Sequence, residues 1–122
     1  QDHVFRFCQA GHPFPILRRE SGAEEISFAA NVPVGFIEAD YDTYEIPIGP
    51  GEDLYIYTDG VTEAQHIETE ELYGVERFLA QLSGEPFGEA TSLEHGVSIV
   101  RDWKKGDTFQ DDVSLLRVSR AK

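Results

Sequence analysis

Acidic residues at two places in the sequence have the chemical character and the setting of metal ligands. Asp59 follows the apolar and aromatic run at 54–58, and Asp111 and Asp112 stand just before another apolar run at 113–118. Both runs have the β-branched and aromatic content of strands, and neighbouring strands would bring the carboxylates close together. Carboxylate oxygens are the ligands that hard cations such as Mg²⁺ and Mn²⁺ prefer. Taken together, the two places predict a divalent-cation site.

Each acidic position also has a purely structural alternative. Asp59 with Gly60 is typical of a tight turn, because Gly supplies positive φ and Asp tolerates the turn geometry. Asp111 and Asp112 are typical of solvated charges that guard a strand start. A calcium loop of the EF-hand type is excluded, because counting Asp59 as the first ligand places Ala64 where Gly is required.

Composition restricts the class of protein. The chain has 122 residues, a net charge of −13 and one cysteine, Cys8. This length fits one domain. The negative charge argues against nucleic-acid and membrane-surface partners, because it repels phosphate backbones and anionic lipids. A single cysteine excludes an internal disulfide, and the sequence has neither a signal peptide nor an apolar run of transmembrane length. We therefore expect a cytoplasmic protein.

The acidic residues must be positioned by strands and helices. Residues 4–9 and 14–19 are expected to pair as a hairpin, followed by short strands at 25–28 and 41–48. The near-continuous apolar run at 54–58 is expected to be a central strand covered on both faces. Two amphipathic helices should follow, before a last strand at 113–118, and this order predicts an α+β fold. The apolar faces of the two helices are formed by Leu72, Val75, Phe78, Leu79 and Leu82, and by Leu93, Val97, Val100 and Trp103.

The segment between the central strand and the first helix is acidic. Its glutamates at 63, 68, 70 and 71 are expected to form a solvated face. His66 lies among them and is expected to be exposed to solvent rather than catalytic, in a loop that could contact a protein substrate. Cys8 is expected to be a small buried apolar residue, and His12 to shape a turn.

Six blocks of the sequence, taken in order, resemble one family. The chain is similar to the C-terminal half of a metal-dependent protein phosphatase domain of the PPM (protein phosphatase 2C-like) superfamily, in its SpoIIE/RsbU branch. The resemblance covers essentially the whole of residues 1–122. The blocks are Ala-Gly-His-Pro at 10–13, Pro-Val-Gly at 33–35, Pro-Gly-Glu-Asp-Leu at 50–54, Tyr-Thr-Asp-Gly-Val-Thr-Glu-Ala at 57–64, Glu-Leu-Tyr-Gly at 71–74 and Asp-Asp-Val-Ser-Leu-Leu at 111–116.

The resemblance implies a fold and a chemistry. The fold is a partial β-sandwich flanked by helices, half of the family's αββα arrangement. Asp59 and Asp111 match the family's metal-binding aspartates, with the Gly60 backbone and Asp112 as further candidates. In the complete domain two Mn²⁺ or Mg²⁺ ions would activate a water for attack on phosphorus. The implied substrate is a phosphorylated STAS-type anti-anti-sigma regulator, dephosphorylated on serine or threonine.

One family block has no counterpart. The family carries an earlier Asp-x-x-Gly-His-Gly block with another metal-bridging aspartate, whereas the only His-Gly here is His95 with Gly96, inside the second predicted helix. We therefore expect residues 1–122 to be the C-terminal part of a single phosphatase domain, inactive alone. The alternative is a non-catalytic phosphatase-like interaction module. Strand edges left open by the missing part predict self-association, for example as a homodimer.

Overall fold

The computed structural model describes residues 4–8, 13–26, 43–88, 92–106, 109 and 112–121, with the side chains of residues 7, 8, 43 and 44 left out. Strands come first, then three helices, then a last strand, as the α+β prediction requires. The elements are β1 (Val4–Cys8), β2 (Ile16–Arg19), β3 (Gly22–Glu25), β4 (Thr43–Pro47), β5 (Asp53–Tyr57), α1 (Asp59–Thr62), α2 (Gly74–Ser83), α3 (Leu93–Lys104) and β6 (Leu115–Ser119).

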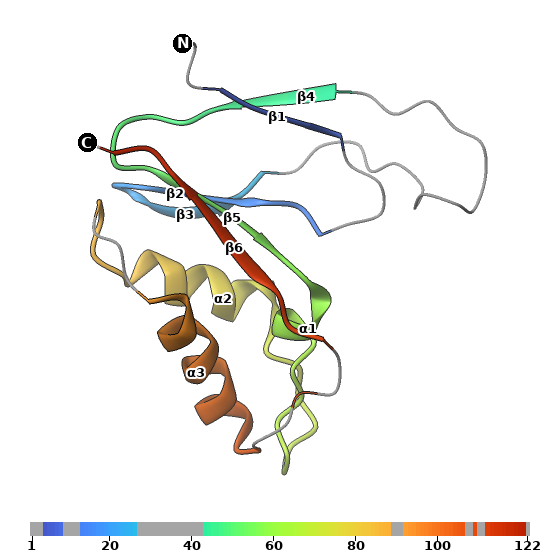
Figure 1. Cartoon of the computed structure of the whole chain (residues 1–122). Helices are drawn as coiled ribbons and strands as arrows, with labels where there is room; N and C mark the ends of the chain where they lie inside the picture. Colours follow the sequence, from blue (N-terminus) through green and yellow to red (C-terminus); the bar gives the residue numbers. More distant parts are fainter. Residues whose placement is uncertain are drawn as a thin grey trace, which may run out of the picture.

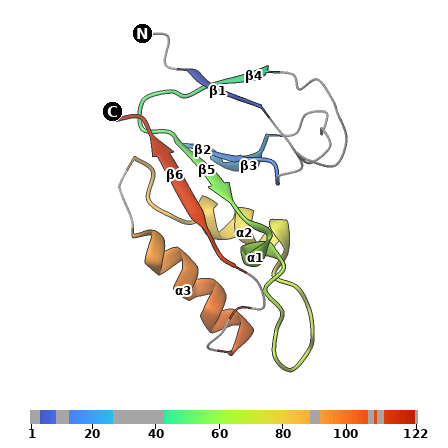
Figure 2. The same ribbon diagram turned by 45° about the vertical axis from the view of Figure 1, so that its right-hand side comes forward.

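The strands form two antiparallel sheets stacked as layers. The larger sheet has four strands in the order β3-β2-β5-β6, and the smaller pairs β1 with β4. Figures 1 and 2 show the small sheet above the large one and α2 and α3 below it. The predicted partial sandwich flanked by helices is therefore confirmed, with α2 and α3 before the last strand.

Strand β5 is covered on both faces, as its apolar run predicted. Leu54 packs with Leu17, Ile46 and Ile48 in a buried cluster between the two sheets. Tyr55 and Tyr57 belong to a second cluster between the large sheet and the helices. This second cluster contains Ile16, Tyr55, Tyr57, Val61, Ala64, Tyr73, Phe78, Leu82 and Val100. Side chains that alternate along β5 thus pack into two different cores. A shift of the strand by one residue would exchange the two sets, so this packing fixes its register.

The predicted hairpin between residues 4–9 and 14–19 is wrong. β1 pairs with β4, while β2 lies between β3 and β5 in the other sheet. Ile16 and Leu17 are both fully buried, one in each core, so β2 needs cover on both faces and takes an interior position in the larger sheet. A local hairpin would not supply that cover.

Several boundaries differ from the predicted ones. The strand expected at 25–28 is β3, at Gly22–Glu25, and α2 begins at Gly74, so Leu72 lies outside it and is 51% exposed. Leu72 instead forms an isolated bridge with Gln65. The burial expected of Cys8 concerns a side chain outside the described part of the structure, and the turn expected at His12 lies outside the described residues.

A buried arginine fastens α2 to the large sheet. Arg18, on β2, is only 6% exposed. Its guanidinium donates hydrogen bonds to the carbonyl oxygens of Leu82 (2.9 Å), Ser83 (3.2 Å) and Glu85 (2.8 Å), and also to that of Arg19. The first three of these carbonyls lie at or just beyond the C-terminal end of α2, where the last carbonyls of a helix lack intrahelical amide partners. The Leu82 carbonyl also accepts from the Glu85 amide at 3.3 Å. Arg18 therefore caps the helix from the sheet.

Candidate metal centre

Asp59 stands where β5 gives way to α1. Thr58 is still extended, with φ −98° and ψ 159°, and Asp59 is the first residue of the helix. The other residues of α1, Gly60, Val61 and Thr62, are buried, whereas Asp59 is exposed. A rigid, buried element therefore presents a carboxylate at the surface, at the end of a central strand.

Hydrogen bonds from Thr58 tie this strand end to the segment that leads into β6. The Thr58 amide donates to the Ser114 carbonyl oxygen at 3.1 Å. Its hydroxyl oxygen accepts from the Ser114 amide at 2.8 Å and donates to the Asp112 carbonyl oxygen at 3.1 Å. The β5–β6 register, which pairs Tyr57 with Leu115, continues through these contacts. Asp112 is thereby held beside the start of α1.

At position 60 there is no room for any side chain, so glycine is required. A Cβ at this position would lie 2.2 Å from the Asp112 carbonyl oxygen and 2.9 Å from the carbonyl carbon. Gly60 is not among the glycines with positive φ, and Asp59 and Gly60 open a helix. The tight-turn alternative for this pair is therefore wrong: the glycine lets two backbone segments meet.

The structure thus brings together three of the four predicted site residues: Asp59, Gly60 and Asp112. Asp111 lies outside the described residues, so its place in the site stays a prediction. Among the residues that the structure does describe, no group of three or more His, Cys, Asp or Glu side chains gathers where it could hold a metal ion. The oxygen donors at hand, carboxylates and a backbone carbonyl, are of the kind that fits Mg²⁺ or Mn²⁺.

Tyr57 is the titratable residue of the core next to Asp59. Burial, with smaller contributions from the carboxylates of Glu25 and Asp59, raises the pKa of its phenol to about 12. Its ring packs edge-on against Phe78, with ring centroids 5.2 Å apart. The phenol therefore stays protonated at neutral pH and is a packing group rather than a base.

A profile of one protein family, described as Stage II sporulation protein E (SpoIIE), matches residues 1–121. The chain belongs to the SpoIIE family. This confirms the family resemblance carried by the sequence blocks. Among curated proteins none matches the sequence.

Solved structures confirm the fold of this SpoIIE-family chain. The RsbU and RsbW domains of Rv1364c from Mycobacterium tuberculosis are 22% identical, with a TM-score of 0.72 over 99% of this chain and 33% of that one. The SiaA-PP2C domain of Pseudomonas aeruginosa is 21% identical, with a TM-score of 0.74 over 96% of this chain and 46% of that one. The Mn-presoaked phosphatase domain of SpoIIE from Bacillus subtilis is 19% identical, with a TM-score of 0.73 over 100% of this chain and 52% of that one. The chain therefore spans between about a third and a half of their length.

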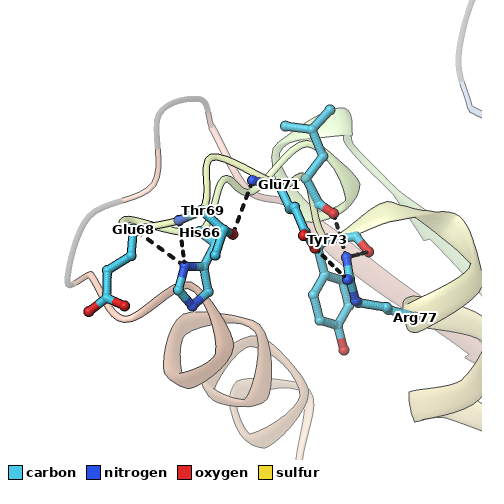
Figure 3. A network of polar contacts seen from close by, with 7 residues as sticks. His66, Glu68, Thr69, Glu71, Tyr73 and Arg77 are labelled. Carbon is cyan, nitrogen blue, oxygen red and sulfur yellow. Dashed lines mark hydrogen bonds and ion pairs between the residues drawn. The ribbon is translucent and has the colours of Figure 1, made fainter.

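Beyond α1, the SpoIIE-family chain forms a short hairpin at 65–72, closed by the bridge between Gln65 and Leu72. His66 organises its turn (Figure 3): its Nδ1 accepts hydrogen bonds from the amides of Glu68 and Thr69, each at 3.2 Å. The His66 ring also packs edge-on against Trp103, with centroids 5.3 Å apart. The prediction of a solvent-exposed His66 is wrong, since the half-buried ring shapes the hairpin.

Arg77, on α2, fastens the second arm of this hairpin. Its guanidinium lies 4.7 Å from the centroid of the Trp103 ring and pairs with the Glu71 carboxylate at 3.0 Å. It also donates to the carbonyl oxygens of Leu72 (2.7 Å) and Tyr73 (3.1 Å).

The glutamates at 63, 68, 70 and 71 are exposed, as predicted. None of the helices in the described part of the chain has both the length and the apolar character needed to cross a membrane.

Proposed function

We propose that this chain is the C-terminal part of a metal-dependent serine/threonine protein phosphatase domain. Asp59 and Asp111 would hold Mn²⁺ or Mg²⁺, with the Gly60 backbone and Asp112 beside them. The observation that carries the proposal is the close contact of Gly60 with the Asp112 carbonyl, where a Cβ would come within 2.2 Å. This contact supports a site built from both acidic positions, because it leaves little room between the segments that bear them.

The chemistry needs no nucleophile from the protein. When bound, the cations would supply a water of lowered pKa as the nucleophile and neutralise charge on the phosphoryl oxygens. The residues of this chain would bind and orient. Asp59 offers its carboxylate from a helix start fixed by buried neighbours, and Thr58 holds the second acidic segment at a constant spacing.

For the substrate, we propose the phosphoserine or phosphothreonine of a STAS-type anti-anti-sigma regulator, in a cytoplasmic partner-switching pathway. The family supports this proposal, and one similar structure combines RsbU and RsbW domains in a single chain. The remainder of the metal site would come from a further part of the phosphatase domain, since the similar structures extend well beyond the matched region.

A second candidate function is a non-catalytic module that binds the same regulator without hydrolysing it. One feature of the sequence favours it: residues 1–122 contain no counterpart of the family's Asp-x-x-Gly-His-Gly block, which carries a metal-bridging aspartate. The two functions differ in what they require of Asp59 and Asp111, so the same variants separate them.

The test uses the full-length protein. Asp59→Asn and Asp111→Asn should each abolish phosphate release from the phosphorylated regulator and weaken Mn²⁺ binding measured by calorimetry, with the thermal unfolding midpoint unchanged. Asp102→Asn, which removes an exposed carboxylate from α3, is the matched control. Near wild-type kcat at saturating Mn²⁺ in either variant would refute that residue's assignment. A wild-type protein that binds the regulator but releases no phosphate would establish the second candidate.

A further inference from the structure

The 65–72 hairpin displays apolar side chains to solvent. Among the described residues, the large hydrophobic side chains counted as exposed are Ile67 (64%), Leu72 (51%) and Leu116 (56%). Two of these three belong to this one short hairpin. Exposed aliphatic surface has an unfavourable hydration free energy, and its concentration in one place is typical of contact surfaces.

The exposure of Ile67 does not result from a loose loop. The Ile67 amide donates to the Lys104 carbonyl oxygen at the end of α3, at 2.9 Å. The neighbouring His66 amide donates to the Glu71 carbonyl oxygen at 2.8 Å, and the His66 side chain secures the turn (Figure 3). Because the backbone at Ile67 is already fixed, binding through this side chain costs little further backbone entropy, which favours a docking role.

The hairpin lies at the same end of the molecule as the candidate metal centre. It follows α1, whose first residue is Asp59, and its closing arm returns through the hydrogen bond from the Tyr73 amide to the Ala64 carbonyl oxygen, at 2.8 Å. In both Figure 1 and Figure 2 it projects from the end of the large sheet where α1 lies. A protein that presented a phosphorylated residue to Asp59 would therefore have its surface beside this hairpin.

The charges around the apolar side chains indicate what kind of surface would fit. Glu63, Glu68, Glu70 and Glu71 are all exposed, and the whole chain carries a net charge of −13. Within the hairpin, Glu68 and Glu70 follow Ile67 closely in sequence, and Glu71 pairs with Arg77. Exposed carboxylates next to an aliphatic side chain are complementary to an apolar pocket bordered by lysine and arginine.

We propose that the 65–72 hairpin is the docking element for the phosphorylated protein substrate, with Ile67 entering an apolar pocket that has a basic rim. This inference rests on the proposed phosphatase function and adds a recognition surface to it. The aspartates would hold the cations that act at phosphorus. The hairpin would contribute only to binding of the protein substrate.

The experiment measures kcat/KM of the full-length protein on two substrates, the phosphorylated STAS-type regulator and the small substrate p-nitrophenyl phosphate. Ile67→Ala should lower kcat/KM for the regulator by roughly tenfold, mainly through KM, because loss of a buried anchor is commonly worth that much. It should leave turnover of p-nitrophenyl phosphate within about twofold of wild type, since a small substrate does not reach the hairpin. Glu68→Lys should also raise KM for the regulator alone, most clearly at low salt.

Glu94→Lys is the matched control for Glu68→Lys, because it reverses the charge of an exposed carboxylate in the first turn of α3, at the opposite end of that helix from the Lys104 carbonyl that the hairpin contacts. It should change neither substrate's kinetics. An Ile67→Ala protein with unchanged kcat/KM for the regulator would overturn the docking proposal while leaving the phosphatase proposal intact. An equal loss on both substrates would also overturn it, since Ile67 would then support the fold or the metal centre. Failure of wild type on both substrates would instead reject the phosphatase function on which the inference rests.

Discussion

The hydroxyl oxygen of Thr58 accepts a hydrogen bond from the amide of Ser114 at 2.8 Å. The same hydroxyl donates to the Asp112 carbonyl oxygen at 3.1 Å, so one side chain bridges the end of β5 and the segment before β6. The spacing between the two acidic positions of the proposed metal centre thus depends on a group that is not itself a ligand. We therefore expect Thr58 to act as a positioning residue for that centre.

Thr58→Val tests this role, because it keeps the shape of the side chain and removes both hydrogen bonds. We expect a loss of about 1 kcal/mol in unfolding free energy and, in the full-length protein, Mn²⁺ affinity lower by several-fold. Calorimetric Mn²⁺ titration and urea unfolding measure the two effects. Thr58→Ser retains the hydroxyl and should restore affinity. Wild-type Mn²⁺ affinity in the valine variant would show that the spacing is held by other contacts.

Local sequence patterns were sufficient for the elements around the site. The apolar run of β5, the stripe of Phe78 and Leu82, and the break after Ser83 all depend on neighbours within one or two helical turns or on strand alternation. Asp59 could be placed at the end of β5 because it comes directly after that apolar run. These positions were predicted correctly, whereas the role of Asp59 and Gly60 in a metal site stays a prediction.

Contacts between residues distant in sequence could not be predicted in the same way. The choice of β4 rather than β2 as the partner of β1 depends on which residues fill each core, and that is decided by the whole sheet. His66 looked like a solvated residue among glutamates because nothing nearby indicates Trp103, which lies on α3. The steric reason for Gly60 likewise depends on Asp112, which comes from the far end of the chain.

Two buried helical glycines allow a matched test of the close contact at the metal centre. Gly60→Ala places a methyl group against the Asp112 backbone, which cannot move aside as a flexible side chain would. We expect a destabilisation of about 1–3 kcal/mol together with weaker Mn²⁺ binding by the full-length protein. Thermal unfolding and Mn²⁺ titration are the measurements.

Gly96→Ala is the control, because its new Cβ would meet the Gln81 Nε2 at 3.5 Å and the Leu115 Cδ2 at 3.9 Å, both ordinary contacts. Inside α3 this substitution should stabilise the protein by about 0.5–1 kcal/mol, the usual gain from glycine to alanine in a helix. If Gly60→Ala behaved like Gly96→Ala, the backbone of Asp112 would have to lie further from α1 than a separation of 2.2 Å from the added Cβ implies.

Arg18 provides the sharpest test of how α2 is held. Arginine is rarely buried without partners, and here the partners are carbonyl oxygens at a helix end reached from a strand more than sixty residues earlier in the chain. Arg18→Met keeps much of the apolar stem but removes the guanidinium donors to those carbonyls, although that of Leu82 keeps a further donor, the Glu85 amide at 3.3 Å. This loss should destabilise the protein by about 2–4 kcal/mol. Arg19→Met is the comparison on the same strand. Arg19 is 45% exposed and pairs with Glu24 at 2.9 Å, a surface ion pair worth less than about 1 kcal/mol.

The urea midpoint should therefore fall steeply for the Arg18 variant and hardly at all for the Arg19 variant, with similar slopes. Equal, small shifts of the urea midpoint in the two variants would mean that water can replace Arg18 as the hydrogen-bond donor to the carbonyls at the end of α2. Packing of Phe78 and Leu82 alone would then hold the helix on the sheet.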